Sequence, residues 1–310
     1  MDNLAIKTHR KRVIKEKASS ICLNVVMIAL SLVMLYPLIY MILGALSDRS
    51  AYLESGLFPV PSMTLERLDN FLIIFRADGL GNALIVTLTR AVFYAVVTTV
   101  TSTIGGYHFS KTNFKGKNFL FMYYMASIMI PGVAVMVPNY LILAKFPLIG
   151  GNNIFGDGGY GFINNVSVLF ITGWVAPYNM FLMRQSFTSL GNEIKEAAEI
   201  DGAGEYRIMF QIYLPLVLPI IAVMIIGLFI GHWNDYLTSL IYLPDLSNWH
   251  TIGTKIIEII DRFGMEGYDI IPNYPRIYGI SIMFMLPPII CFLCFQNLFV
   301  SGLAMGSVKG

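Results

Sequence analysis

The sequence predicts an all-α, polytopic membrane protein with six transmembrane helices and both termini in the cytoplasm. Hydrophobic residues make up 56% of the 310 positions and charged residues 13%, which is more apolar surface than a water-soluble domain of this length can bury. Six apolar runs are each long enough to cross a hydrocarbon core as a helix, which takes about 20 residues. The Lys and Arg residues between these runs are divided unequally between the two sides.

The six predicted spans are helical because lipid offers backbone N–H and C=O groups no hydrogen-bond partners. The first run is longer than the apolar core of a signal peptide, about 7 to 15 residues, so we expect it to stay in the mature protein. Prolines within the runs remove a backbone donor and allow a kink or a broken span. The approximate bounds of the spans are 20–46, 82–109, 118–141, 162–187, 214–240 and 277–302. The prolines are Pro37, Pro131, Pro138, Pro177, Pro219, Pro287 and Pro288.

The orientation follows from the distribution of Lys and Arg. One side collects 13 of them, from the first 19 residues, the second and fourth loops and Lys309. The other side has 7, spread over longer loops, and Arg90 lies within a span. Since the side richer in Lys and Arg is cytoplasmic, both termini are predicted to be cytoplasmic.

The same pattern divides the chain into a basic cytoplasmic segment, residues 1–19, and one membrane domain, residues 20–310. The basic stretch THRKRVIKEK, residues 8–17, is explained by a topology signal, while a lipid-surface anchor or a contact with a partner protein are alternatives. The external loops are too short to form an independent domain of about 50 residues or more.

No catalytic, metal-binding or nucleotide-binding site is expected within the chain. The histidines form no HExxH motif, and no Ser, His and acid are placed together. The cysteines fall in apolar runs and are expected to be inert. There is no GxxxxGK followed by Ser or Thr, and the glycine-rich GDGGYG at 156–161 lies in an external loop without a Lys. The residues concerned are His9, His108, His232, His250, Cys22, Cys291 and Cys294.

The loop between the fourth and fifth spans, about residues 188–213, carries the most informative stretch. Asn192 is a good helix cap and Glu193 suits a first turn, so a short helix is predicted up to Asp201, where Gly202 supplies a permissive turn. A second short helical segment follows, over about 204–211, until Pro215 resets the chain. The predicted product is a helix, a turn and a helix across the cytoplasmic mouth.

The first of these helices has features that suit docking into another protein. Ala197 and Ala198 have almost no side chain, so a partner's groove could approach the backbone, while Glu196, Glu199 and Asp201 supply charges around the contact. Taken alone, the pattern also fits an amphipathic helix at the membrane surface, which many membrane proteins have between spans.

A longer motif decides between these readings. The spacing of EAA, three residues, Gly, nine residues, Ile, one residue and LeuPro resembles the signature of the binding-protein-dependent ABC importer permeases. The matching positions are Glu196, Ala197, Ala198, Gly202, Ile212, Leu214 and Pro215. Residues 233–235, WND, and the C-terminal QNLFVSGLAMGSVKG, residues 296–310, look like the carbohydrate uptake branch of that family. The similarity covers most of the chain.

The resemblance implies a division of labour among several subunits. An extracytoplasmic solute-binding protein would deliver an oligosaccharide. The pathway would be formed by this chain and a second permease subunit, which is usually a different chain. Two ATP-binding subunits would hold ATP and Mg²⁺. Residues Glu196 to Gly202 would sit in an ATPase cleft and convert its closure into helix motion. The resemblance places the protein in a bacterial cytoplasmic membrane and implies no nucleic-acid partner.

Two charges within spans indicate a buried ion pair or a cavity mouth. Arg90 lies about eight residues from the external end of the second span and Asp235 about five from that of the fifth, so helical rise puts them at similar depth. Because charges inside a span are costly, we expect them to pair or to line the pathway, while simple snorkelling of Arg90 is the alternative.

Candidate residues for sugar contacts are aromatic or carry amides or carboxylates, since sugar rings present C–H faces and hydroxyls. Most of them equally fit interface anchors or packing, because Tyr and Trp gather near span ends. In the related maltose system the sugar contacts come mainly from the other permease. The candidates are Arg90, Tyr123, Tyr124, Asn139, Tyr140, Trp174, Tyr178, Asn179, Trp233, Asn234 and Asp235.

The last external loop, residues 241–276, is long enough to reach a docked binding protein, and IGTKIIEIIDRF at 252–263 has helical amphipathicity. In the sugar branch a segment of this loop enters the binding protein, and its equivalent here would lie near Ser247 to Gly253.

Two alternatives remain. A secondary transporter would not need the EAA spacing and usually has more spans with inverted repeats. Within the importer class the solute could be another polar compound, such as glycerol phosphate or a polyamine, although no strong basic cluster marks the pathway for a phosphate.

Overall fold

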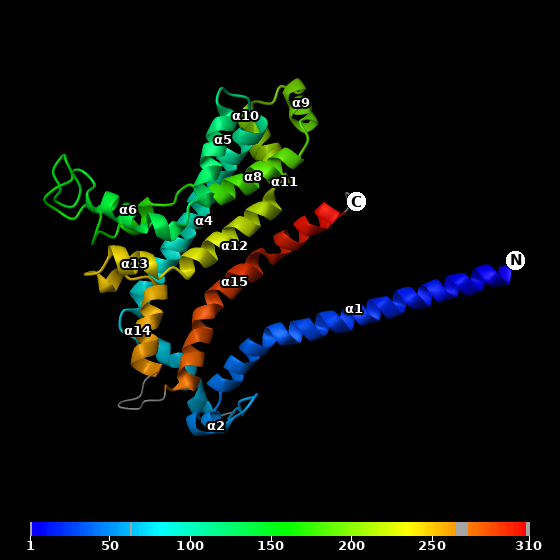
Figure 1. The fold of residues 1–310 in the computed structure, drawn as a ribbon, viewed down its shortest axis with the longest axis horizontal. Coiled ribbons are helices and arrows are strands. Elements are labelled where there is room, and N and C mark those ends of the chain that lie inside the picture. Colours follow the sequence, from blue (N-terminus) through cyan, green and yellow to red (C-terminus); the bar gives the residue numbers. More distant parts are fainter. Residues whose placement is uncertain (1, 63, 265–271, 308–310) are drawn as a thin grey trace. The chain divides into compact units, whose positions relative to one another are not determined.

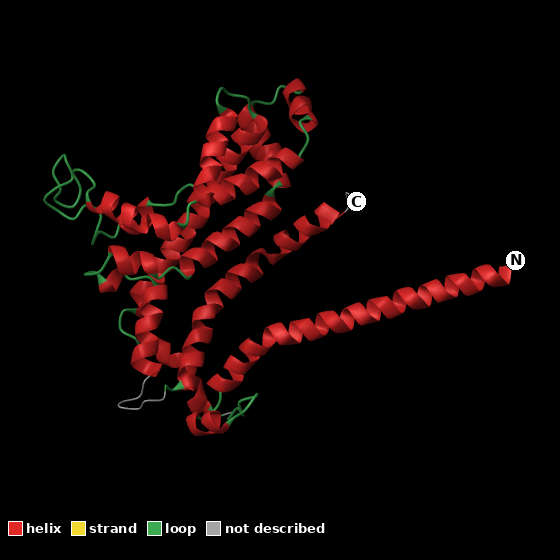
Figure 2. Cartoon of the chain, in the orientation of Figure 1, coloured by secondary structure: helices red, strands yellow, loops and turns green. Residues whose placement is uncertain are grey.

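The computed structural model describes residues 2–62, 64–264 and 272–307, and within these residues all regular elements are helices (Figures 1 and 2). The all-α prediction is confirmed. The last three residues of the expected C-terminal pattern, 308–310, and part of the last external loop, 265–271, lie outside the described residues. The chain forms two compact units, Met1–Arg76 with Ile260–Phe284, and Ala77–Ile259 with Met285–Gly310.

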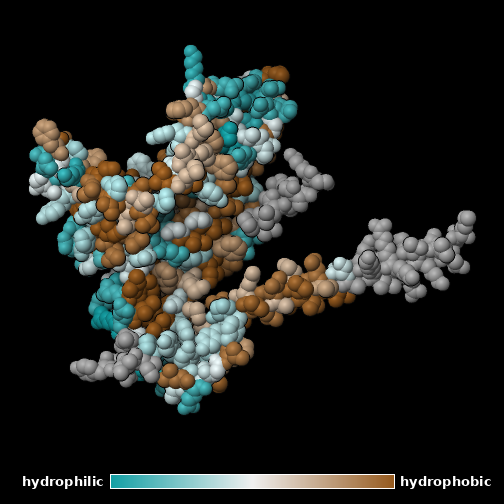
Figure 3. Space-filling model, in the orientation of Figure 1, coloured by the Kyte–Doolittle hydropathy of each residue, from teal (hydrophilic) through white to brown (hydrophobic). Residues whose placement is uncertain are grey.

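The first unit is built around α1, Asp2–Ala45, in which the basic stretch and the first apolar run form one helix without a break at residue 20. Apolar side chains between residues 21 and 35 cover the exposed surface of α1 (Figure 3). Near its end, Asn70 donates a hydrogen bond of 2.8 Å to the Ala45 carbonyl. The Tyr52 and Tyr278 hydroxyls lie 2.8 Å apart. The short elements of this unit are α2 (Arg49–Glu54), η1 (Leu65–Leu68), α3 (Asp69–Leu72) and η2 (Ile73–Arg76).

The second unit contains the functional loop and most of the packed helices. Its elements are α4 (Leu80–Lys111), α5 (Lys117–Ala126), η3 (Ser127–Met129), α6 (Gly132–Ala144), α7 (Val168–Ile171), α8 (Pro177–Ser189), α9 (Glu193–Ile200), α10 (Glu205–Arg207), the π-helix η4 (Ile208–Tyr213), α11 (Leu214–Leu216), α12 (Leu218–Trp233), α13 (Leu237–Tyr242) and η5 (Ser247–Trp249). Helices α14 (Ile252–Gly264) and α15 (Tyr274–Ser307) each belong partly to both units.

Helix α4 is the central element of the second unit. Its 32 residues extend for about 48 Å at 1.5 Å per residue. It packs mainly against α8 and α12 (Figure 1). Towards its C-terminal end, Tyr107 joins a hydrophobic cluster with residues of α8, α9, η4 and α12. Towards its N-terminal end, Val86 joins a second cluster with residues of α6, α7 and the segment after α13. A single rigid helix therefore connects the two cores.

Three of the six predicted spans are continuous helices. The runs 20–46, 82–109 and 277–302 fall within α1, α4 and α15, which are long and apolar enough to cross a membrane. The third and fifth runs each form a pair of helices with a bend between them. Each pair is long and apolar enough to cross a membrane only when its two helices are counted as one span. Their bends are 102° between Lys117–Met129 and Gly132–Ala144, and 77° between Glu205–Leu216 and Leu218–Trp233. The described residues thus contain three candidate spans, or up to five.

The prolines divide between breaks and helix interiors. Pro131, Pro177 and Pro219 lie at the starts of α6, α8 and α12, where the chain changes direction. By contrast Pro37, Pro138, Pro287 and Pro288 lie inside α1, α6 and α15. A proline at the first helical turn removes no intrahelical hydrogen bond, which explains why the breaks occur where they do.

The expectation of one helix over 162–187 is wrong. The chain there forms the single turn α7, a break and the 13-residue α8. Gly173 in the break has φ of +87°, a conformation that favours glycine. Side chains of α4 donate hydrogen bonds to the carbonyls that the break leaves free. Thr101 donates to the Trp174 carbonyl at a distance of 2.6 Å, and Tyr94 donates to the Thr172 carbonyl. Side-chain donors from a neighbouring helix are what allow a broken helix at membrane depth.

Candidate functional site

The predicted helix, turn and helix between spans is confirmed in its first part. Helix α9 begins at Glu193 and ends at Ile200, with Asn192 and Asp201 as its flanking residues. The second segment begins after Gly204 as predicted, but the chain stays helical through Pro215 and breaks at Val217 instead. Pro215 lies in the first turn of α11, where its ring is tolerated.

Gly202 ends α9 in a Schellman motif. Its φ is +77°, its N–H donates 3.0 Å to the Glu199 carbonyl, and the N–H of Ala203 donates 2.9 Å to the Ala198 carbonyl. The hydrogen bond to the Ala198 carbonyl requires a residue in the left-handed conformation four positions after Ala198, which is the position of Gly202. The spacing of EAA, three residues and Gly therefore has a local structural reason: Ala198 and Gly202 occupy the two positions that terminate the helix.

The two alanines of the motif differ in exposure, since neighbouring residues on α9 point about 100° apart. Ala197 is exposed together with Glu196, whereas Ala198 is 7% exposed and packs in the cluster that contains Tyr107 and Tyr213. In this structure only Ala197 is accessible to a partner. Ala198 is small because α9 lies close to the core. The outer face also includes Ile200, 86% exposed, and Tyr206 on α10, 80% exposed.

Lys111, the last residue of α4, fixes the start of this helix, and sequence reasoning did not single it out. Its buried Nζ donates to the Leu190 carbonyl, to the Gly191 carbonyl at 3.2 Å and to Asn192 Oδ1 at 3.0 Å. The side chain of the predicted cap residue thus serves Lys111 rather than the first N–H groups of α9. The ammonium also lies 5.2 Å from the centre of the Tyr213 ring, and a cation at the carbonyl end of α8 is favoured by the helix dipole.

A second group of polar side chains ties α4 to both halves of the loop. Tyr107 donates 2.7 Å to Glu205 Oε2, and the other oxygen of that carboxylate pairs with Lys195. Lys195 also donates 3.0 Å to the Lys111 carbonyl and lies 3.7 Å from Glu199. Because hydrogen bonds to charged groups are stronger than neutral ones, this network holds α9 and α10 together against the end of α4. Hydrophilic side chains gather around α9 and α10 (Figure 3).

The predicted pairing of Arg90 with Asp235 is confirmed. Arg90 Nη2 lies 2.6 Å from Asp235 Oδ2, with side-chain exposures of 4% and 22%. Arg90 Nε donates 3.1 Å to the Leu169 carbonyl in α7, and Thr238 donates 2.5 Å to the same carboxylate oxygen of Asp235. The pair connects α4, α7 and the break between α12 and α13.

An aromatic ring of α4, Tyr94, lies beside the guanidinium of this pair, and the sequence did not indicate it. The guanidinium lies 5.6 Å from the centre of the Tyr94 ring, which stacks on His232 at 4.1 Å. Phe93 packs edge-on against Phe170 and against Trp174. Tyr94 and Phe93 are adjacent on α4, and an aromatic residue four positions after an intramembrane Arg is the signal that could have revealed the contact.

The remaining pathway candidates are scattered. Tyr123, Asn139, Trp174, Tyr178 and Asn234 are exposed and Tyr124 is half-buried, so their polar groups or rings are accessible in this chain. Tyr140 is half-buried and stacks on Tyr242. Asn179 and Trp233 are 9% and 1% exposed, so neither side chain can contact a solute in this conformation. In the described residues no hydrogen bond, ion pair or ring contact links Tyr124 or Asn139 to the Arg90–Asp235 pair.

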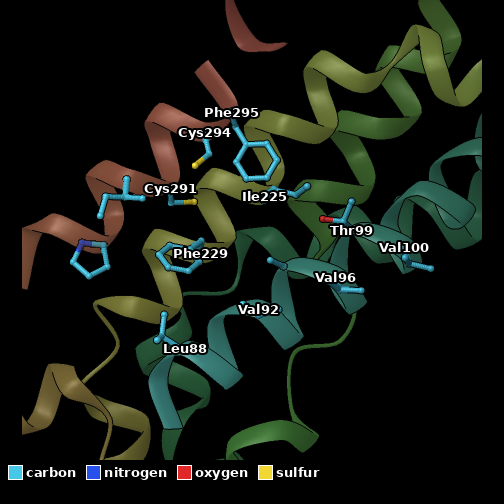
Figure 4. A pocket seen from close by; sticks show the side chains of 13 residues that line it. Leu88, Val92, Val96, Thr99, Val100, Ile225, Phe229, Cys291, Cys294 and Phe295 are labelled. Atoms are coloured by element: carbon cyan, nitrogen blue, oxygen red, sulfur yellow. The ribbon is translucent and has the colours of Figure 1, made fainter. Parts of the chain in front are cut away.

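An apolar cavity of about 630 Å³ lies between α4, α12 and α15 (Figure 4). Thr99 is its one polar side chain, and the remaining walls come from residues such as Val92, Phe229 and Phe295. Cys291 and Cys294 lie on the α15 wall, in the apolar setting that the sequence predicted for them. None of the pathway candidates lines this cavity. A cavity without hydrogen-bonding groups does not suit a sugar, whose hydroxyls need partners.

The segment expected to reach a binding protein is exposed only in its first half. Ser247, Asn248 and Trp249 are exposed. Thr251 and Ile252 are buried, and the Ile252 N–H donates 2.7 Å to Thr87 Oγ1 on α4.

The described residues contain no cluster of His, Cys, Asp or Glu that could hold a metal ion.

The family model described as "Binding-protein-dependent transport system inner membrane component" matches residues 100–304, more than half of the chain. The chain belongs to this family. As an inner membrane component it is a membrane protein and a transport subunit, and the resemblance read from the EAA spacing is confirmed. The match includes α9, Gly202 and the network around Lys111.

Relatives and a solved structure agree with this membership. The chain is 29% identical to the arabinooligosaccharides transport system permease protein AraQ of Bacillus subtilis, over 94% of this chain and 96% of that one. It is 28% identical to the protein of the same name in Halalkalibacterium halodurans, over 91% and 93%. The fold is similar to a chain of a bacterial ABC transporter involved in the import of the acidic polysaccharide alginate, with a TM-score of 0.69, 20% identity and coverage of 92% and 98%.

Proposed function

We propose that this chain is the permease subunit of an ATP-driven, binding-protein-dependent ABC importer, and that it forms half of the translocation pathway for an oligosaccharide. The observation that carries the coupling is the placement of α9. Its outer face is exposed, while Ala198 on its inner face packs in the cluster with Tyr107, and Lys111 and Lys195 hold its N-terminal half to the end of α4. Since packed helices move as rigid bodies, a partner that displaces α9 displaces α4 with it.

The proposed topology has six spans and both termini in the cytoplasm of a bacterium. Contacts at the two ends of α4 support it. The C-terminal end bonds to the fourth loop through Lys111 and Gly191. Towards the other end, the Ile252 N–H donates to Thr87, and the Asn164 N–H donates 2.8 Å to the Tyr242 carbonyl. The second and fourth loops thus share one end of α4, and the third and fifth share the other, as alternating spans require. The fourth span, which brings the five candidates to six, is the broken α7–α8 segment.

The proposed partners are two ATP-binding subunits, a second permease that is a different chain, and an extracytoplasmic solute-binding protein. ATP and Mg²⁺ are held by the ATP-binding subunits, and this chain holds no cofactor and binds no nucleic acid. The coupling residues are Glu196, Ala197, Asp201 and Gly202 on the outer face of α9 and its turn, with Ala198 on the inner face. The names of the two AraQ proteins support an oligosaccharide as the solute.

The coupling proposal is tested by the ATP-binding subunit that co-purifies with the tagged chain. Ile200→Asp and Tyr206→Asp place a charge on the exposed face of α9 and α10, and we expect each to reduce recovery of the ATP-binding subunit strongly. Ile154→Asp and Tyr160→Asp are matched controls, since these residues are 64% and 74% exposed on the loop at the other end of the unit. Equal recovery from all four variants, or no ATP-binding subunit with the wild type, would refute the proposal.

The solute is tested in the complete complex reconstituted in lipid with its binding protein. We expect ATP hydrolysis to rise when the binding protein carries an oligosaccharide, and to stay at the basal rate with glycerol phosphate or a polyamine. A rise with one of the latter solutes only would replace the oligosaccharide by that compound and leave the coupling proposal intact.

A further inference from the structure

A polar cavity of about 440 Å³ lies at the junction of α4, α5 and α8, on the side of the loop that carries α9. It is separate from the apolar cavity and from the outer face of α9, and none of the candidate pathway or coupling residues lines it. Its polar walls come from Ser110, Asn113, Lys117, Asn118, Arg184 and Thr188. All of these side chains can donate hydrogen bonds, and no carboxylate lines the cavity.

The two cations of the cavity are held in place by the protein but lack a counter-charge. Lys117 Nζ donates 2.7 Å to the Thr112 carbonyl and 3.2 Å to the Ser110 carbonyl. Arg184 Nε donates 3.2 Å to the Phe109 carbonyl, and its guanidinium lies 4.1 Å from the centre of the Phe121 ring. In the described part of the chain no Asp or Glu oxygen lies within 4.0 Å of either side chain.

The nearby charges do not neutralise this pair. Lys115 is exposed beside it on the loop between α4 and α5, and Lys111 is engaged by carbonyls and an amide oxygen. Lys195 is paired with Glu199 and Glu205, so these carboxylates are occupied elsewhere. Two fixed cations that share a cavity repel one another, and an anion between them relieves the repulsion. The first turn of α5, whose N–H groups lack intrahelical partners, adds to the positive potential.

The border of the cavity is apolar, which distinguishes a lipid from a free ion. Phe114 and Phe119 line it and are 42% and 68% exposed. From Phe119 the exposed apolar surface continues along α5 through Leu120, Met122 and Tyr123. An anion seated between Lys117 and Arg184 would thus have its apolar part laid against the side of a helix that belongs to a membrane-spanning segment.

We propose that this cavity binds the phosphate of an anionic phospholipid headgroup in the leaflet on the side of α9, with the acyl chains along α5. Basic cavities between spans on the cytoplasmic side are suited to such headgroups. Lys117 and Arg184 supply the charge, Ser110, Asn113, Asn118 and Thr188 supply hydrogen bonds to the phosphate and glycerol oxygens, and the phenylalanines cover the start of the chains. Phosphatidylglycerol has this chemistry, whereas the headgroup of phosphatidylcholine adds a cation that the cavity repels.

The experiment is native mass spectrometry of the delipidated complete transporter, titrated with dioleoylphosphatidylglycerol or dioleoylphosphatidylcholine. We expect the wild type to prefer phosphatidylglycerol and Lys117→Gln and Arg184→Gln each to lower that preference about fivefold. Arg207→Gln removes an exposed cation outside the cavity and is expected to leave the preference unchanged. Arg184→Lys keeps the charge, so retained preference in this variant separates charge from misfolding.

Three results would overturn the proposal. The first is a preference for phosphatidylglycerol that is as strong in Lys117→Gln as in the wild type. The folded Arg184→Lys variant then shows that substitutions in the cavity are tolerated. The second is displacement of phosphatidylglycerol by inorganic phosphate, which would make the cavity a site for free phosphate. The third is a preference that is absent from the complete transporter and appears only after the ATP-binding subunits are removed, which would mean that a carboxylate of those subunits fills the cavity.

Discussion

Lys111 Nζ lies 3.0 Å from Oδ1 of Asn192, so the last residue of α4 holds the N-cap residue of the exposed helix α9. The two residues are 81 positions apart in the sequence. The contact converts two elements that the sequence describes separately, a membrane span and a loop helix, into one mechanical unit.

Replacing Lys111 by Met is expected to uncouple α9 from α4. The change leaves the half-buried Leu190 carbonyl without this donor, at a cost of about 1–3 kcal/mol, whereas Gly191 and Asn192 are exposed and the Gly191 carbonyl still accepts a hydrogen bond from Tyr213. ATP hydrolysis by the reconstituted complex should then respond less to loaded binding protein, while basal hydrolysis persists. Lys115→Met, at an exposed position four residues on, is the control. An unchanged response in Lys111→Met would show that the contact does not transmit motion.

Breaking the Arg90–Asp235 pair from one side is expected to be worse than removing both charges. Asp235→Asn leaves a guanidinium that is 4% exposed without a carboxylate, for which the expected cost is about 3–5 kcal/mol. In Arg90→Met/Asp235→Asn the stranded charge is gone, so part of the stability should return. Thermal unfolding of the purified protein and a double-mutant cycle measure the difference. The exposed Arg76–Asp69 pair, expected to contribute less than about 1 kcal/mol, is the comparison.

Substitution of Gly202 is expected to depend on the backbone preference of the new residue. At φ of +77° an alanine is strained by about 1–2 kcal/mol, whereas Asn adopts this conformation more readily. Within this chain no atom lies within 4 Å of a Cβ added at Gly202. Gly202→Ala should therefore lower the stability of the loop more than Gly202→Asn, as hydrogen exchange of α9 would report. Equal exchange in the two variants would contradict this reason.

Gly202→Asn also tests for a close partner surface. If the variant folds normally but the complex no longer hydrolyses ATP in response to substrate, the added side chain must meet an atom of another subunit. Gly202→Asp, which adds a charge as well, is expected to lose that response while the complex still assembles.

A methyl group at Gly106 is expected to separate α4 from α8. A Cβ there would lie 2.5 Å from Met183 Cβ and 2.8 Å from the Arg184 backbone nitrogen, and neither atom can move without shifting α8. Overpacking of this kind costs about 1–3 kcal/mol. Gly227→Ala on α12 is a matched control, since no atom lies within 4 Å of its added Cβ. A melting temperature of Gly106→Ala equal to that of the control would contradict the predicted clash.

Much of the loop that carries α9 could be predicted because its structure is local. The cap position of Asn192, the length of α9 and the turn at Gly202 depend on residues a few positions apart, and the Schellman motif needs only the spacing of Ala198 and Gly202. The pairing of Arg90 with Asp235 could also be predicted, because the cost of a charge in lipid restricts its partners to other charges at the same depth.

The inner face of α9 could not be predicted in the same way. Both Ala197 and Ala198 suit an exposed helix or a close contact, and only packing against Tyr107 and Tyr213 decides which alanine lies inside. Pro177 allowed a kink or a break in the fourth span, but the apolar run gave no means to place the break at Gly173. That break is stable because Tyr94 and Thr101 of α4 bond its free carbonyls.

By itself the sequence determined that this protein is all-helical, apolar enough to lie in a membrane and built around an EAA loop. These properties follow from composition, from periodicity and from contacts within a few residues. Only the tertiary structure decided which side chains hold the loop to α4, which spans are broken and where two cations share a cavity. Those relationships join residues 67 to 98 positions apart, such as Lys117 with Arg184 and Tyr107 with Glu205, and the free energy that selects them comes from burial and hydrogen bonding between whole helices.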